Sequence, residues 1–395
     1  MEHGALFYLF IILFTAKIFS NLFSKLNQPP VLGEIFAGVL LGQSVLGLVP
    51  IDEMVKFLAE LGVILLLFQV GLESDLNKLI KVGFYALVVA FIGAFTPMII
   101  GTLACYYLFN LPFHISLFIG GTLTATSIGL TVRVLEDLGK MKERFAQIVL
   151  GAAVLDDIIG VIVLAGLIGF IRKNVVEISV ISKLIIVISL FFIFSPFISQ
   201  IIFKFINRIS QKLKMTELTI GLIISFVFLI SYISKAIDAP EILGAFVAGL
   251  ALSKGFEIPG IKYFKPDEQL SETIHNILNP LVLIFTPLFF AYVGIQLNLK
   301  AIDFVDAKFW VYSLVILAIA IFGKVVSGFF VNKATFNEKL LIGFSMLPRG
   351  EVGLIFAEYG RINKIYDDFL YAVIIFVVAF TTFMAPIFLK ALVKK

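Results

Sequence analysis

Two adjacent carboxylates, Asp156 and Asp157, lie in the middle of an otherwise uncharged apolar stretch between Arg144 and Arg172. The stretch is about as long as one helix that crosses a bilayer. A carboxylate at that depth is costly unless it faces a protein or water-filled interior. Desolvation and the neighbouring negative charge both favour its neutral form. Such a pair can exchange a proton for a hard cation such as Na⁺, whereas a buried structural ion pair is the alternative interpretation.

Lys324, in the stretch IAIAIFGKVVSGFF, is a positively charged residue within another predicted span. A desolvated lysine loses its proton more readily when an incoming cation takes its carboxylate partner. We therefore predict that Lys324 pairs with one aspartate when no cation is bound. Breaking and reforming that pair would give the two-state element that alternating access needs. The alternative is that Lys324 extends towards the membrane surface, which its long side chain could reach only in part.

Two segments combine polar residues with helix breakers at their centres. The first is GGTLTATSIGLTVRVLEDLG, with Thr124, Thr126 and Ser127, and the second is IGFSMLPRGEVGLIFAEYG, with Arg349 and Glu351. Interrupted helices in corresponding halves of a transporter often form its ion site, because unwound carbonyls can bind a cation. We expect Na⁺ at Asp157, Asp156 and Thr126. Equally, the hydroxyl groups could bond back to helix carbonyls, and the proline could produce only a kink. For Arg349 we favour a role in balancing half-helix dipoles or in pairing with Glu351.

The elements that position these residues are predicted to be membrane-spanning helices. The chain has 395 residues, of which 60% are hydrophobic and 15% charged, well below the usual charge content of soluble domains. We predict an all-α polytopic membrane protein. The thirteen expected spans are 5–23, 31–49, 55–72, 82–109, 114–135, 145–171, 178–206, 218–237, 241–253, 274–295, 304–331, 340–359 and 369–392.

The chain also repeats itself. PPVLGEIFAGVLLG from Pro29 matches APEILGAFVAGLALS from Ala239, and the pairs Gly71/Gly294 and Gly129/Gly353 follow in the same order. The copies lie seven spans apart, so the second copy is expected to be inverted in the membrane, as in many secondary transporters. Shared glycines could instead reflect tight helix packing alone. In this scheme the seventh span joins the two copies.

Lys and Arg in the connections predict the orientation. An outside N-terminus places 19 of them inside and 9 outside, which favours an inside C-terminus in the cytoplasmic membrane. Glu34 lies near a span end and is expected at the interface. The single Cys105 allows no intrachain disulfide, and no Cys or His cluster suggests a transition metal. We expect no cofactor and no nucleic-acid partner, whereas membrane lipids and the transported ions are expected to contact the protein.

Taken together, TLTATSIGLTVRVL, AAVLDDIIGVIVLA, PLFFAYVGIQLNL, FGKVVSGF and MLPRGEVGLIFA resemble the second family of monovalent cation:proton antiporters. That family includes NapA-type Na⁺/H⁺ antiporters and the membrane domain of Kef-type K⁺ systems. The resemblance covers nearly the whole chain. It implies thirteen helices with crossed discontinuous helices in the fifth and twelfth spans, a homodimer, and a mobile core that moves against a dimerisation scaffold. The implied ranges are 1–76 and 215–302 for the scaffold, 77–172 and 303–395 for the core, and 173–214 for the linker.

The resemblance also implies roles for individual residues. Asp157 matches the essential ion-binding aspartate, Asp156 the first acidic residue of the pair, and Lys324 its lysine partner. An aspartate in the first position is typical of electrogenic Na⁺ exchange, whereas asparagine or glutamine is typical of electroneutral or K⁺-handling relatives. The sequence ends at Lys395 without the cytosolic nucleotide-binding domain of Kef systems, so we expect no regulation of that kind in this chain.

The predicted function is therefore exchange of Na⁺, with Li⁺ as a further substrate, for protons. K⁺/H⁺ exchange on the same frame and Na⁺-coupled symport of an organic solute remain as alternatives. An intramembrane aspartyl protease is a more distant one. That chemistry needs two aspartates on opposite sides of the scissile bond, and two neighbours on one helix cannot provide this. The expected class is a transporter and not an enzyme.

Overall fold

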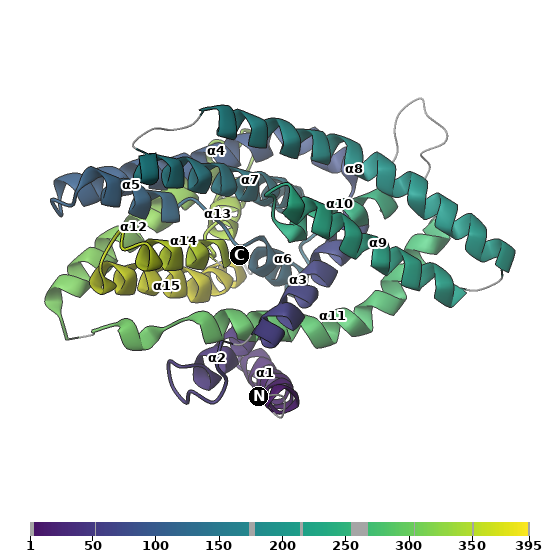
Figure 1. Cartoon of the computed structure of the whole chain (residues 1–395), viewed down its shortest axis with the longest axis horizontal. Coiled ribbons are helices and arrows are strands. Elements are labelled where there is room, and N and C mark those ends of the chain that lie inside the picture. Colours follow the sequence, from purple (N-terminus) through teal and green to yellow (C-terminus); the bar gives the residue numbers. More distant parts are fainter. Residues whose placement is uncertain are drawn as a thin grey trace. The chain divides into compact units, whose positions relative to one another are not determined.

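The computed structural model describes residues 4–51, 53–173, 178–213, 216–253, 268–303, 305–349 and 351–393, and all regular structure in these ranges is helical (Figure 1). The helices are α1 (Ala5–Lys25), α2 (Pro30–Leu41), α3 (Glu53–Glu73), α4 (Leu76–Tyr107), α5 (Phe113–Thr122), α6 (Ile128–Asp137), α7 (Arg144–Lys173), α8 (Ile178–Leu213), α9 (Thr216–Ala236), α10 (Glu241–Leu252), α11 (Glu268–Gln296), the short 3₁₀ helix η2 (Leu299–Ala301), α12 (Ala307–Phe329), α13 (Phe336–Ser345), α14 (Glu351–Ile362) and α15 (Asp368–Val393).

Eight of the helices in the described residues are long and apolar enough to cross a membrane. Four further apolar helices are shorter, and they include α2, α5 and α10. The polytopic membrane class expected from composition is therefore confirmed. The second predicted span was too long, because the helix ends at Leu41 and the following residues to Pro50 are not helical. Several lysines used to predict the orientation, such as those at 254, 262 and 265, lie outside the described residues.

The chain divides into two compact units. Unit 1 contains Met1–Phe57, Val82–Glu177 and Pro287–Lys395, and unit 2 contains Leu58–Lys81 and Ile178–Thr286. In unit 1, α12 packs on α13 and α15, and α7 packs on α5, α6 and α13. In unit 2, α8, α9 and α10 pack on one another. All of the candidate site residues belong to unit 1.

Each of the two polar, glycine-containing segments forms two helices. In the first, α5 ends at Thr122 and α6 begins at Ile128. In the second, α13 ends at Ser345 and α14 begins at Glu351. The unwound residues are buried: Thr124 and Arg349 are both fully inaccessible to solvent. The backbone groups that these breaks release must therefore find partners inside the protein.

Glycines bring helix backbones into contact in unit 1. A Cβ atom added at Gly38 of α2 would lie 1.8 Å from the Ala291 carbonyl oxygen of α11. One added at Gly294 of α11 would lie 2.1 Å from the Ile35 oxygen of α2. Close approach of this kind is how small residues drive helix association in lipid, where the hydrophobic effect does not act between helices.

Unit 2 contains the same arrangement at the corresponding positions of the repeat. A Cβ atom at Gly249 of α10 would lie 2.1 Å from the Phe68 oxygen of α3, and one at Gly71 would lie 2.2 Å from the Phe246 oxygen. In the alignment of the two copies, Gly249 corresponds to Gly38 and Gly71 to Gly294. Each pair of contacts thus joins a helix from one copy to a helix from the other.

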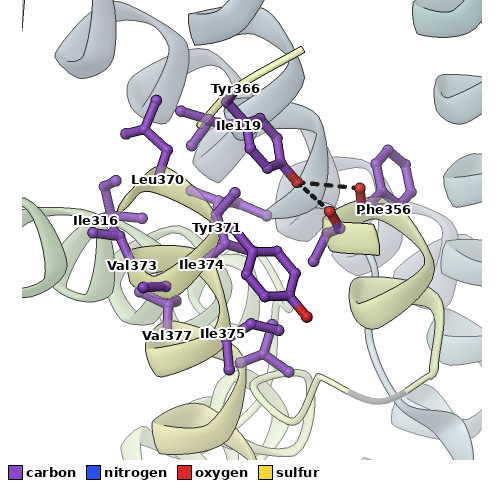
Figure 2. Close-up of a cluster of buried hydrophobic side chains, with 14 of the residues drawn as sticks. Ile119, Ile316, Phe356, Tyr366, Leu370, Tyr371, Val373, Ile374, Ile375 and Val377 are labelled. Atoms are coloured by element: carbon purple, nitrogen blue, oxygen red, sulfur yellow. Dashed lines mark hydrogen bonds between the residues drawn. The ribbon is translucent and has the colours of Figure 1, made fainter. Parts of the chain in front are cut away.

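An apolar cluster in unit 1 surrounds α15 and supports the end of α14 (Figure 2). The Tyr366 hydroxyl donates to the Ala357 carbonyl at 2.6 Å and lies 3.3 Å from the Phe356 carbonyl. The Tyr366 ring covers Gly360, where a Cβ atom would lie 2.3 Å from the ring. These contacts attach the second half of the second broken helix to the start of α15.

Substitution of Gly38 by alanine should destabilise the protein. The added methyl group collides with the α11 backbone, which cannot move away as a side chain can, and overpacking of this kind costs about 1–3 kcal/mol. A lower melting temperature of the purified protein in detergent would measure the effect. Gly83→Ala is the matched control, because nothing lies within 4 Å of its Cβ position in α4. Equal melting temperatures for the two variants would contradict the prediction.

Candidate functional site

The site is built around a buried ion pair between α7 and α12. Asp156 is 1% exposed and Lys324 is fully buried. Lys324 Nζ lies 3.1 Å from Asp156 Oδ2 and 3.3 Å from Oδ1. The same ammonium group donates to the carbonyl oxygen of Thr124 in the first unwound segment. The Lys324 ammonium group therefore links α12 to α7 and to the unwound segment between α5 and α6.

Asp157 and Arg349 complete the set of buried charges. Asp157 is 1% exposed, and both residues lie close enough to Lys324 to act on it electrostatically, after Asp156 itself. Two carboxylates and two cations thus share a region with little solvent. Because Coulomb interactions are strong in a low-dielectric interior, each charge depends on the others.

The hydroxyl groups of the first break differ in what they do. Thr124 Oγ1 donates to the Gly121 carbonyl at 2.8 Å, which is the local back-bonding considered from the sequence. Thr126 Oγ1 instead reaches the second break and donates to the Met346 carbonyl at 3.0 Å. Ser127 caps α6, since its hydroxyl oxygen accepts from the Leu130 amide at 3.5 Å.

Hydrogen bonds hold the two breaks against each other. The Ser127 amide donates to the Pro348 carbonyl at 2.8 Å. Thr131 Oγ1 of α6 donates to the Ser345 carbonyl at the end of α13, at 2.7 Å. These bonds satisfy backbone groups that a continuous helix would have satisfied itself. The two unwound segments therefore lie side by side.

Arg349 serves the end of the first half-helix. Its Nη1 atom donates to the carbonyl oxygens of Thr122 and Ala125, each at 3.2 Å. These oxygens lie where α5 ends, and a cation at a helix C-terminus interacts favourably with the helix dipole. Arg349 Nε and Nη2 have no hydrogen-bond partner among the described residues. The side chain of Glu351 lies outside the described residues.

Two hydroxyl groups at the site were not predicted. Thr131 belongs to the same polar stretch as Thr126 and lies one helical turn after Ser127, so its spacing could have indicated it. Thr382 of α15 donates to the Arg349 carbonyl and to the Val378 carbonyl, the latter at 2.7 Å. Its position in a long apolar segment gave no signal, because membrane threonines usually bond only to their own helix.

The arrangement presents oxygen ligands to a cation. The Asp156 carboxylate and the Thr124 carbonyl already hold one positive group, the Lys324 ammonium. Carboxylate and carbonyl oxygens are also the ligands that hard metal cations take in proteins. Among the described residues, no group of three His, Cys, Asp or Glu side chains could hold a transition metal. The arrangement is thus suited to the replacement of one cationic group by another.

Comparison with known proteins agrees with this chemistry. A family model described as "Sodium/hydrogen exchanger, transmembrane" matches residues 10–395. The high-affinity Na⁺/H⁺ antiporter NhaS3 of Synechocystis sp. is 34% identical over 98% of this chain and 89% of its own length. The Na⁺/H⁺-K⁺ antiporter GerN of Bacillus cereus is 31% identical over 99% of this chain and 96% of its own.

A solved structure has the same fold. The sodium proton antiporter MjNhaP1 from Methanocaldococcus jannaschii, determined at pH 8, superposes with a TM-score of 0.71 and covers 100% of this chain and 98% of its own. Its sequence identity is 17%, so the likeness concerns the fold.

Removal of the Thr131 hydroxyl should loosen the contact between the two breaks. Thr131→Val keeps the shape but deletes the bond to Ser345, and such bonds in membranes contribute about 0.6–1.7 kcal/mol. We expect a lower melting temperature in detergent. Thr381→Val is the control, because within the described part of the chain the Thr381 hydroxyl bonds only to its own helix, at the carbonyls of Val377 and Val378. A control that is as destabilised as Thr131→Val would argue against a special role for this bond.

Proposed function

The chain belongs to the sodium/hydrogen exchanger family, and from that premise we propose that it exchanges Na⁺, with Li⁺ as a further substrate, for protons at the site around Asp156 and Asp157. It is a multi-pass membrane transporter and not an enzyme, so the protease alternative is dropped. The observation that carries the proposal is the fully buried contact of Lys324 with Asp156 and the Thr124 carbonyl.

The exchange works by competition. In the described arrangement the lysine ammonium fills the space between a carboxylate and an unwound carbonyl. An entering Na⁺ takes these oxygens, Lys324 leaves Asp156, and the loss of its partner favours release of a proton. Return of protons reverses these steps. Asp157 binds the ion together with Asp156 and Thr126, so that Na⁺ and protons occupy the site in turn.

Movement of the site across the membrane is proposed to follow the elevator scheme. Eight helices in the described ranges are long and apolar enough to cross a membrane. Counting α5 with α6 and α13 with α14, we propose that the α-helices in these ranges form thirteen spans. The matched glycine contacts, Gly38 with α11 and Gly249 with α3, support two related copies. We propose that the copies are inverted, that 77–172 and 303–395 form the moving core, and that 1–76 and 215–302 form the scaffold of a homodimer, with 173–214 as linker.

The finer properties follow from the charges of the site. Two carboxylates and a lysine can bind more protons than the charge of one Na⁺ balances, so we propose electrogenic exchange. The proposed location is the cytoplasmic membrane, with the N-terminus outside and the C-terminus inside. K⁺/H⁺ exchange is the second candidate, because the name of GerN includes K⁺. Antiport assays in proteoliposomes with Na⁺, Li⁺ and K⁺ in turn, at clamped membrane potential, would decide between them.

Asp157→Asn should abolish exchange. The amide cannot carry a proton or a negative charge, so the competition between Na⁺ and protons disappears. The measurement is Na⁺-dependent proton flux in proteoliposomes, with Asp303→Asn as the control because Asp303 is an exposed carboxylate in the connection before α12. Proton flux that persists in Asp157→Asn would refute the assignment of the site.

Lys324→Gln should weaken the transport current by about tenfold or more. Removing one partner of a buried, hydrogen-bonded charge pair costs about 2 kcal/mol or more of free energy. The current can be recorded on a supported membrane after a jump in Na⁺ concentration. Lys308→Gln is the control on the same helix, since Lys308 is exposed at the start of α12 and lies over the rings of Tyr312 and Phe369. An unchanged current in Lys324→Gln would remove this lysine from the cycle.

A further inference from the structure

Glu34 of α2 is a buried acidic residue for which the exchange mechanism has no use. The sequence placed it at the membrane interface, but its side chain is fully buried, which corrects that expectation. Its Oε1 atom accepts a long hydrogen bond of 3.4 Å from the Ser20 hydroxyl of α1. Its Oε2 atom has no hydrogen-bond partner among the described residues. A buried carboxyl oxygen in that situation costs free energy that a stable fold normally avoids.

The charged groups that act on Glu34 come from two neighbouring helices. They are, in order of strength, Arg133 and Asp137 of α6 and Lys17 of α1. Arg133 Nε lies 3.4 Å from Asp137 Oδ1 but forms no hydrogen bond within the described residues. An acceptor on α2 and a donor on α6 therefore each lack a hydrogen bond, and the two helices pack against each other.

The two helices differ in what holds them. α2 is attached by backbone contacts at its glycines: a Cβ atom at Gly33 would lie 2.3 Å from the Phe19 oxygen of α1, and Gly38 touches α11. α6 is the second half of the first broken helix, joined to the second break through Thr131. Glu34 and Arg133 thus lie where a helix of the proposed scaffold meets a helix of the proposed core.

We propose that Glu34 is a positioning residue whose carboxylate attracts Arg133 and so holds α6 against α2 in one of the two conformations of the transport cycle. Movement of α6 along α2 separates the charges, so the attraction stabilises one conformation only. A contact of this kind sets the ratio of the two conformations and therefore the concentration of Na⁺ at which exchange is half-maximal. The proposal rests on the proposed exchange for its transport readout, but the contact itself can be tested without it.

The test is a double-mutant cycle with Glu34→Gln and Arg133→Gln. We expect each single variant to change the KM for Na⁺ by about fivefold in the same direction, with a smaller change in maximal rate. The double variant should resemble Arg133→Gln, because without Arg133 the Glu34→Gln substitution has no attraction left to remove. Glu53→Gln, at an exposed position in the first turn of α3, is the control and should leave the KM unchanged.

Hydrogen–deuterium exchange of the purified protein gives a readout that does not depend on transport. Both single variants should exchange faster in residues 128–137, while residues 144–173 exchange as before. The proposal would be overturned by additive changes in KM. It would also be overturned if deuterium exchange in residues 128–137 equalled that of the unaltered protein, or if Glu34→Gln behaved as wild type in both assays. If the unaltered chain shows no Na⁺/H⁺ exchange, the proposed function fails. The deuterium-exchange rates of residues 128–137 still decide the role of Glu34.

Discussion

The structure depends on the high cost of an unpaired charge inside the membrane. Asp156 and Lys324 can both be fully buried only because each neutralises the other and because the Thr124 carbonyl accepts a further bond from the ammonium group. Neither group can remain if the other leaves, unless something else of the same charge arrives. In the exchange we propose, the ion pair is therefore also the element that couples cation entry to a change in protonation. If Asp156 and Lys324 could be buried independently of each other, their ion pair would contribute to the structure alone.

A second constraint follows from the broken helices. Unwinding a helix in a membrane leaves carbonyl and amide groups without partners, and water cannot satisfy them. Here the partners are divided by type. The carbonyls at the end of α5 receive cationic donors, Arg349 and Lys324, whereas those at the end of α13 receive hydroxyl donors, Thr126 and Thr131. The sequence thus uses polar side chains as substitutes for backbone bonds, and these substitutes fix the site.

Much of this arrangement could be predicted from the sequence because the signals were local and physically costly. Two adjacent aspartates in an apolar stretch need a function, and clusters of glycine, proline and hydroxyl residues mark broken helices. The role of Lys324 was predicted only as a pair with an aspartate. Its bond to the Thr124 carbonyl was not predictable. Every residue has a backbone carbonyl, so the residue types do not indicate which carbonyl will accept a bond. Thr382 was missed for the same reason: its partner is the carbonyl of Arg349.

Burial was the least predictable property. Glu34 is close to the start of α2, and position in a span suggested exposure to the interface. The helix is buried there because Gly33 allows the α1 backbone to approach closely and because α6 also packs against α2. Both facts depend on contacts between segments far apart in the sequence, which periodicity cannot indicate.

The division of donors between the two breaks has a consequence for how the site responds to an ion. Arg349 bonds to Thr122 and Ala125 and, unlike Lys324, has no carboxylate hydrogen-bonded to it among the described residues. It can therefore stay in place while Lys324 exchanges its aspartate for a different environment. In the proposed cycle, the first break would keep Arg349 as a permanent cation and would lose or regain Lys324 with each ion bound. The second break has neutral donors in Thr126 and Thr131, so its own charge balance does not change with the position of Lys324. In the proposed exchange, ion binding would therefore act first on the helix pair α5 and α6, and would reach α13 and α14 through the bonds from Thr126, Ser127 and Thr131.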